Sequence, residues 1–308
     1  MSLAGAISLQ FLADGLIAGA TIGLGAIGVT LTYSILRFAN FAHGEFISIG
    51  CYLTLTIAGA CGAWLPASRA TLGDFSLSCG VIAAALLAVP LTGLLALGLD
   101  AVLFRPLRAR GTPITAVIAS FGASLALRAL LELAFSSRPR YFTQELQIAI
   151  PLGFGVRATP DQMALLGVTA VLVVALHVIL TRTGTGRAMR AVSENPTLAR
   201  VVGIDVAQVI RLTWLFGAGL AASAGILLGL VVQIRPTMGA ELLLPLFAAA
   251  ILGGIGSVPG ALAGGLIVGI AEAATVQFAG AEWRAAVAFL VLIAVLLLRP
   301  KGLFGRAD

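Results

Sequence analysis

The chain has 308 residues, of which 59% are hydrophobic and only 10% charged, and its formal net charge is +6. Soluble domains carry about 25% charged residues, so this composition excludes a water-soluble enzyme and a disordered chain. The apolar residues form long continuous runs, which excludes the alternating pattern of an outer-membrane barrel. Because only helices satisfy their own backbone polar groups in lipid, the sequence predicts an all-α, polytopic bundle of transmembrane helices.

Hydropathy predicts nine apolar segments, within a range of eight to ten spans. They lie near 9–35, 44–62, 78–103, 113–135, 161–181, 209–233, 242–256, 259–279 and 283–298. A span needs about 20 residues, so 44–62 and 242–256 are short, and each is a candidate for a broken or re-entrant helix. We expect 1–308 to form one transmembrane domain, with its longest connections at 136–160 and 182–211.

The basic residues predict the orientation through the positive-inside rule. Twelve lie on one side, at Arg37 and within 104–111, 182–211 and 299–306, against six on the other side. This asymmetry places 182–211 and the C-terminus in the cytoplasm, and nine crossings then place the N-terminus and the loop 136–160 outside. The arginines cluster between apolar runs, so we interpret the positive charge as a topology signal and expect no nucleic-acid partner.

Glycine is ordered within the first span, where Gly15, Gly19 and Gly23 are spaced by four residues. Small residues at this spacing let helix backbones approach closely in a membrane. The pattern therefore predicts a tightly packed helix–helix contact along one face of this span.

The segment from Arg37 to Phe46 places Asn40, His43 and Glu45 between the first two apolar runs. Charges at membrane depth are costly and are expected to face a protein interior or an aqueous path. These three residues are therefore candidates for lining a translocation path. An ordinary cytoplasmic connection between two spans explains the segment equally well.

A glycine-rich stretch, 253–261, interrupts the apolar region 242–279. Irregular backbone at membrane depth is tolerated where it is buried in protein or lines a cavity, so Gly253, Gly254 and Gly256 are further candidates for the path. A tight inner turn between two spans is the alternative.

Isolated polar residues lie inside other predicted spans. Arg128 and Glu132 are one helical turn apart and are predicted to pair. Gln233 and Glu272 lie toward the outer side, where they could contact substrate or form hydrogen bonds between helices. We include Glu272 among the candidates for the path.

The loop 182–211 contains the signals of a short helix over 196–202. Asn195 can cap it, Pro196 suits its first turn, and Gly203 can end it in the left-handed conformation. The apolar residues on this helix are Leu198, Val201 and Val202, with Arg200 beside them. An apolar stripe on a helix outside the membrane needs a partner, either a separate protein or this chain's own helices.

No catalytic or metal-binding constellation is evident, and the three cysteines lack C-x-x-C spacing. The pattern G-x-x-x-x-G-K-[ST] does not occur, and the only lysine is Lys301. We therefore predict a protein that is not an enzyme and has no cofactor of its own. If it carries out ATP-driven transport, the ATPase is another chain.

Taken together, these motifs resemble the permease subunits of high-affinity branched-chain amino-acid ABC importers. The similar segments are 40–45 after the first span, 186–191 and 199–204 in the cytoplasmic loop, 253–261, and 299–304 at the end. By this resemblance 182–211 is the coupling loop. Its candidate ATPase contacts are Arg187, Arg190, Glu194, Leu198, Arg200, Val201, Val202 and Gly203.

The resemblance implies a multi-pass protein of the bacterial inner membrane that imports Leu, Ile or Val across the lipid bilayer. It implies three kinds of partner: a second, homologous permease, two cytoplasmic ATPases that hold ATP and Mg²⁺, and a periplasmic substrate-binding protein. Related importers of urea and short amides share much of the pattern. A secondary transporter driven by an ion gradient is the alternative from a different class.

Overall fold

The structure is a computed structural model that describes residues 3–65, 70, 71, 73, 75–143, 147–153, 155–299 and 302–305. Its α-helices are α1 (Leu3–Leu36), α2 (His43–Trp64), α3 (Cys79–Leu99), α4 (Arg105–Arg110), α5 (Pro113–Phe135), α6 (Pro160–Arg182), α7 (Gly184–Glu194), α8 (Pro196–Val201), α9 (Val206–Val231), α10 (Met238–Gly253), α11 (Val258–Phe278) and α12 (Arg284–Leu298). A π-helical turn, Asp100–Phe104, joins α3 to α4, and a 3-10 turn, Ala281–Trp283, precedes α12. The strands β1 (Ile150–Gly153) and β2 (Val156–Ala158) form an antiparallel hairpin.

Eight helices in the described part of the chain are long and apolar enough to span a membrane. This confirms the predicted polytopic all-α fold and agrees with the predicted range of spans. The segment predicted at 44–62 forms α2, whose 22 residues suffice for a full crossing. The segment predicted at 242–256 forms α10, which has only 16 residues and is too short to cross on its own.

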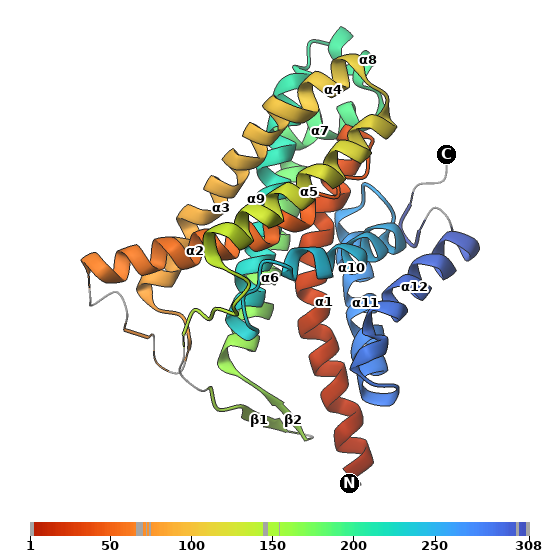
Figure 1. Ribbon diagram of the computed structural model, residues 1–308. Coiled ribbons are helices and arrows are strands. Elements are labelled where there is room, and N and C mark those ends of the chain that lie inside the picture. Colours follow the sequence, from red (N-terminus) through yellow and green to blue (C-terminus); the bar gives the residue numbers. More distant parts are fainter. Residues whose placement is uncertain are drawn as a thin grey trace.

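Figure 1 shows α1 along the long axis of the molecule, with α3, α4 and α5 on one side and α12 on the other. Helices α7 and α8 lie at one end, here called the α8 end, and the β1–β2 hairpin lies with the start of α1 at the other, the hairpin end. Short α10 crosses α1 near the middle of the molecule, and it connects to α11 through a turn. The irregular segment 232–237 joins α9 to this short helix.

The predicted glycine contact joins α1 to α11. A Cβ atom on Gly15 would lie 2.7 Å from the Cα of Ile270, and one on Gly19 would lie 2.7 Å from the Cα of Leu266. Such distances leave no room for a larger residue, so the two backbones pack directly together. The close packing predicted from the spacing is confirmed.

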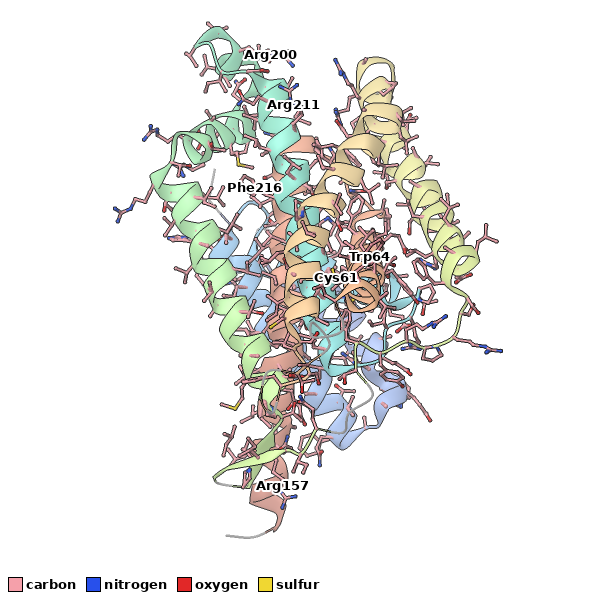
Figure 2. The ribbon with its side chains drawn as sticks, turned by 90° about the vertical axis from the view of Figure 1, so that its left-hand side faces the viewer. Cys61, Trp64, Arg157, Arg200, Arg211 and Phe216 are labelled. Atoms are coloured by element: carbon pink, nitrogen blue, oxygen red, sulfur yellow. The ribbon has the colours of Figure 1, made fainter. Side chains whose placement is uncertain are left out.

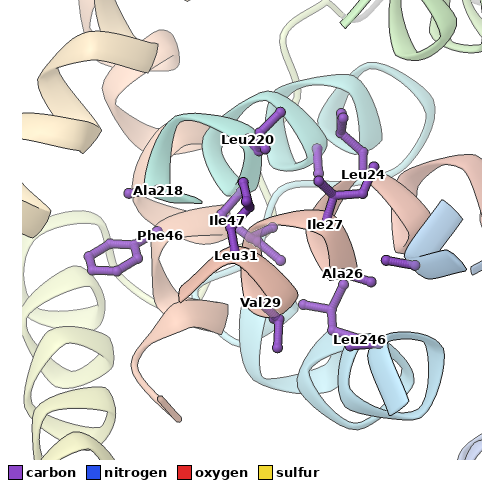
Figure 3. Close-up of a cluster of buried hydrophobic side chains, with 14 of the residues drawn as sticks. Leu24, Ala26, Ile27, Val29, Leu31, Phe46, Ile47, Ala218, Leu220 and Leu246 are labelled. Carbon is purple, nitrogen blue, oxygen red and sulfur yellow. The ribbon is translucent and has the colours of Figure 1, made fainter. Parts of the chain in front are cut away.

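A cluster of buried hydrophobic side chains holds the centre of the bundle together. Leu24, Ile27 and Leu31 of α1 meet Ile47 of α2 and Leu246 of α10, all of them buried (Figure 3). Because lipid is as apolar as these side chains, close van der Waals packing rather than the hydrophobic effect stabilises this contact.

Candidate functional site

The α8 end contains the short helix that the sequence predicts. The Asn195 side chain accepts hydrogen bonds from the backbone N–H groups of Thr197 and Leu198, both at 3.0 Å. Gly203 adopts a φ of 84°, and the N–H of Ile204 donates to the carbonyl of Ala199 at 2.9 Å. These contacts satisfy both ends of α8 in the predicted way.

The apolar side chains of this helix point away from the rest of the chain. Leu198, Val201 and Val202 are 59%, 79% and 67% exposed, whereas Ala199 is buried against the bundle. Arg200 lies on the same exposed part of the molecule (Figure 2). The contact with this chain's own helices is thus made by alanine, and the larger apolar groups are left uncovered.

The other predicted coupling residues surround α8. Arg187 and Arg190 lie exposed on α7, and the guanidinium of Arg190 donates to the carbonyl of Leu180. Glu194 is exposed at the end of α7. The guanidinium of Arg37 donates to the carbonyls of Ser193, at 2.5 Å, and Glu194, at 3.4 Å. The C-terminal end of α1 is thereby tied to α7, where a cation also complements the helix dipole.

The residues of the 40–45 segment lie inside the protein. Asn40, His43 and Glu45 are buried. The Asn40 side chain accepts a hydrogen bond from the N–H of Ala42, at 3.1 Å, which shapes the turn before α2. A Cβ atom on Gly28 of α1 would lie 2.8 Å from the His43 ring, so this imidazole fills the gap between α1 and α2.

Glu45 is the centre of a buried polar contact between α2 and α5. Its Oε1 accepts hydrogen bonds from the Ser124 hydroxyl and from the Arg128 guanidinium, each at 2.8 Å. The predicted pair between Arg128 and Glu132 is therefore wrong. Arg128 turns toward the buried carboxylate of another helix, because an unpaired charge there would be more costly than one on Glu132, which is partly exposed.

The glycine-rich stretch forms the turn between α10 and α11. The N–H of Ser257 donates to the carbonyl of Gly254 at 3.1 Å, and Gly254 and Gly256 have φ values of 95° and 90°. Gly253 ends α10. The structure thus has the tight turn, which was one of the two readings of this stretch.

A cleft of about 760 Å³ opens near the hairpin end, between α1, α6, α9, α10, α11 and α12. Of the residues predicted for the translocation path, Glu272 lines this cleft, as does Gln233, which was expected near the outer side. Asn40, His43, Glu45, Gly253, Gly254 and Gly256 do not line it.

Two ion pairs lie in the cleft. The Oε2 atom of Glu272 lies 2.7 Å from the Nε of Arg284, and the Oε2 of Glu241 lies 3.2 Å from an Nη atom of Arg235. From the sequence, Arg235 and Arg284 were predicted only as two of the six basic residues on the outer side. Arg284 lies at the start of α12, one helix after the predicted intramembrane acid Glu272. This position was the one signal in the sequence that could have identified Arg284.

No group of three or more His, Cys, Asp or Glu side chains suited to a metal ion occurs within the described residues. The polar groups of the cleft include two carboxylates paired with guanidinium groups. Such an arrangement binds charged organic groups through hydrogen bonds.

Comparison with known proteins gives consistent matches over nearly the whole chain. A family profile described as "Branched-chain amino acid transport system / permease component" matches residues 11–296. The high-affinity branched-chain amino acid transport system permease protein LivH of Escherichia coli K12 is 35% identical over 305 residues, which cover 97% of this chain and 96% of LivH. BraD of Pseudomonas aeruginosa, a permease protein described in the same words, has the same identity and coverage.

More distant similarity extends to an archaeon and to one solved structure. The probable LivH of Methanocaldococcus jannaschii is 28% identical over 296 residues, which cover 91% of this chain and 87% of that protein. PsaBC from Streptococcus pneumoniae, solved in complex with Fab, covers 96% of this chain and 94% of its own with a TM-score of 0.48 and 14% identity. That structural likeness adds nothing to the family assignment.

Proposed function

This chain belongs to the permease family of branched-chain amino-acid transport systems, and we infer that it is the subunit through which an ATP-driven importer moves Leu, Ile or Val. It is a multi-pass protein of the bacterial inner membrane. It forms the translocation path with a second, homologous permease, and a periplasmic binding protein delivers the amino acid to its outer mouth. Two cytoplasmic ATPases hold the ATP and Mg²⁺, so this chain itself holds no cofactor and catalyses no reaction.

The observation that carries this proposal is the uncovered apolar surface of α8. The exposed Leu198, Val201 and Val202 side chains stand on a helix outside the spans, between α7 and the start of α9. Exposed apolar groups of this kind mark an interaction site. A cytoplasmic ATPase that docks there would push directly on α9, since only the four residues 202–205 separate α8 from the first turn of that span.

The arginines support the orientation that this docking requires. Arg187, Arg190, Arg200 and Arg211 all lie at the α8 end. Figure 2 shows Arg200 and Arg211 at this end, far from Arg157 near the hairpin. Under the positive-inside rule the α8 end faces the cytoplasm and the hairpin end faces the periplasm. The cleft then opens toward the side from which a binding protein delivers substrate.

The test is to place a charge at the centre of the apolar surface. Leu198→Asp would bury an unpaired carboxylate in the interface. Gly203→Val would force a β-branched residue into a φ of 84° and so tilt α8. Truncating a central anchor of an interface weakens binding by about 2 kcal/mol or more, roughly thirtyfold. We expect both variants to insert normally and to lose the ATPase subunits during purification of the complex.

The matched control is Leu152→Asp, the same change at a half-exposed leucine of β1 at the hairpin end. This variant should retain the ATPases. Normal ATPase retention in Leu198→Asp, together with normal hydrolysis stimulated by loaded binding protein, would show that α8 is not the docking element. Uptake that persists with hydrolysis-defective ATPases and an ion gradient would refute the importer assignment itself.

A further inference from the structure

We propose that the cleft at the hairpin end is a binding site for a free zwitterionic amino acid with an aliphatic side chain, the Glu272–Arg284 pair recognising its two charges. The inference rests on the function proposed above and adds to it the residues that select the substrate.

The Glu272–Arg284 pair is asymmetric in a way that leaves hydrogen-bonding groups for a ligand. Glu272 is 3% exposed and Arg284 is 51% exposed, and they are joined through Oε2 and Nε at 2.7 Å. Within the described residues, neither the second carboxylate oxygen, Oε1, nor the terminal guanidinium nitrogens make another hydrogen bond. An acceptor for a cation and a fork of donors for an anion therefore lie side by side.

A zwitterionic amino acid matches these two groups. Its ammonium carries three N–H donors, of which one can reach Oε1 of Glu272, and its carboxylate can accept two hydrogen bonds from the guanidinium of Arg284. The ammonium and the carboxylate of an amino acid lie close together, as do the side chains of Glu272 and Arg284. One ligand can therefore contact both groups. Binding would leave each charge of the pair, and each charge of the ligand, with an opposite charge beside it.

The rest of the cleft is suited to an aliphatic side chain. Its apolar lining includes Ile17 of α1, Leu165 of α6, Leu228 of α9 and Leu242 of α10. The volume of about 760 Å³ lies in the usual range for small-molecule sites.

The irregular segment between α9 and α10 forms a further wall, and its conformation is tied to a second polar cluster. Arg235 pairs with Glu241, and the Thr237 hydroxyl donates to the other oxygen of Glu241 at 2.8 Å. Irregular backbone is tolerated at membrane depth where it lines a cavity. These contacts leave Glu241 occupied on both oxygens. Of the two carboxylates in the cleft that are paired with an arginine, Glu272 is therefore the one with a free oxygen for the ligand.

The same chemistry argues against urea and short amides as ligands of this site. A neutral amide would bring no charge to Oε1 of Glu272 or to the terminal guanidinium nitrogens of Arg284, which would keep only each other as ionic partners. Sites built to bind a polar group reject analogues that lack it much more strongly than apolar pockets reject a change of size. The cleft therefore favours the amino-acid branch of the family.

The experiment uses L-photo-leucine, an aliphatic amino acid that carries a diazirine, and the purified complex of permeases and ATPases without binding protein. On irradiation the diazirine loses N₂, and the resulting carbene inserts into a neighbouring C–H bond. We expect adducts on peptides that contain Ile17 or Leu242. Leucine should compete for labelling. Urea, acetamide, 4-methylpentanoate, which lacks the ammonium, and 3-methylbutylamine, which lacks the carboxylate, should compete at least about tenfold less well.

Variants of the pair supply the second measurement. Glu272→Gln and Arg284→Gln should each reduce leucine-sensitive labelling at least about tenfold, as expected when a charged hydrogen-bond partner is lost, and Arg284→Lys should restore part of it. The matched control is Arg211→Gln, which removes an exposed arginine from a weak pair with Asp205 at the α8 end. This variant should label like the unmodified protein, and size-exclusion profiles show whether each variant is folded.

Three results would overturn the proposal: labelling outside the cleft, labelling that leucine does not reduce, or equal competition by 3-methylbutylamine. In each case ATPase retention by the same preparation would show that the importer assignment still stands. Loss of ATPase retention in the unmodified complex would instead refute the proposed function, independently of the cleft.

Discussion

The buried contact between Glu45 and Arg128 predicts a large loss of stability when only one partner is removed. Glu45 is fully buried, and Arg128 is its one charged partner among the described residues, at 2.8 Å. In Arg128→Met the carboxylate would retain only the hydrogen bond from the Ser124 hydroxyl. Breaking a buried ion pair from one side costs about 3–5 kcal/mol, which corresponds to a change of roughly two to four powers of ten in the unfolding equilibrium.

A double variant separates the pair from the packing around it. Glu45→Gln combined with Arg128→Met removes both charges and keeps a side chain that can accept from Ser124. Replacing a buried pair by uncharged groups of similar size is often close to neutral, so we expect the double variant to recover most of the lost stability. The control is Arg211→Met, whose pair with Asp205 is 3.8 Å long and more than half exposed on both sides, and which should change stability by less than about 1 kcal/mol.

The assay is reversible unfolding in mixed detergent micelles, followed by tryptophan fluorescence. Trp214 is a suitable probe because it is completely buried and stacks on Phe104, with ring centroids 5.2 Å apart. If Arg128→Met unfolds with the same free energy as the unmodified protein, or if the double variant is as unstable as the single one, the pair does not stabilise the fold as reasoned here.

Two further predictions concern topology and helix packing. In a background without native cysteines, Ser193→Cys should be protected from an impermeant maleimide in intact spheroplasts, whereas Arg157→Cys at the hairpin end should react; the reverse pattern would invert the orientation. Gly19→Ala should lower the yield of folded protein because its Cβ would lie 2.7 Å from the Cα of Leu266, whereas Gly122→Ala, with nothing within 4 Å, should be tolerated. Equal yields, read from size-exclusion profiles, would contradict the close α1–α11 contact.

The features that the sequence predicted correctly are those encoded by neighbouring residues. Asn195, Pro196 and Gly203 lie within nine positions of one another, and each acts on backbone groups of α8 or its ends. Capping depends on such local contacts, so the position of α8 could be predicted without knowing any tertiary contact. The glycine spacing of α1 likewise predicted a close contact between helices, but it did not identify α11 as the helix that packs there.

The contacts that the sequence did not predict join residues far apart in the chain. Arg128 has an acidic neighbour one turn away, yet it pairs with Glu45 of another helix. An interaction at i, i+4 contributes only a few tenths of a kcal/mol, whereas an unpaired buried carboxylate costs several. The stronger requirement decides the pairing, and it becomes visible only once burial is known. Arg284 was missed for the same reason, because its partner lies on the preceding helix across a turn.

The glycine-rich turn after α10 and the C-terminal segment around Leu303 were predicted as separate motifs, but they form one backbone contact. The N–H groups of Leu303 and Phe304 donate to the carbonyls of Leu252 and Gly253, at 2.8 and 3.1 Å. The last carbonyls of a helix need partners, and Leu252 and Gly253 at the end of α10 are buried. The C-terminal segment supplies those partners, but only if two backbones can touch. A Cβ atom on Gly254 would lie 2.5 Å from the nitrogen of Gly305, and Gly254 also has a φ of 95°. Glycine at 254 is therefore required by the segment that caps α10, and this close packing accounts for the residue without any contact to a transported molecule.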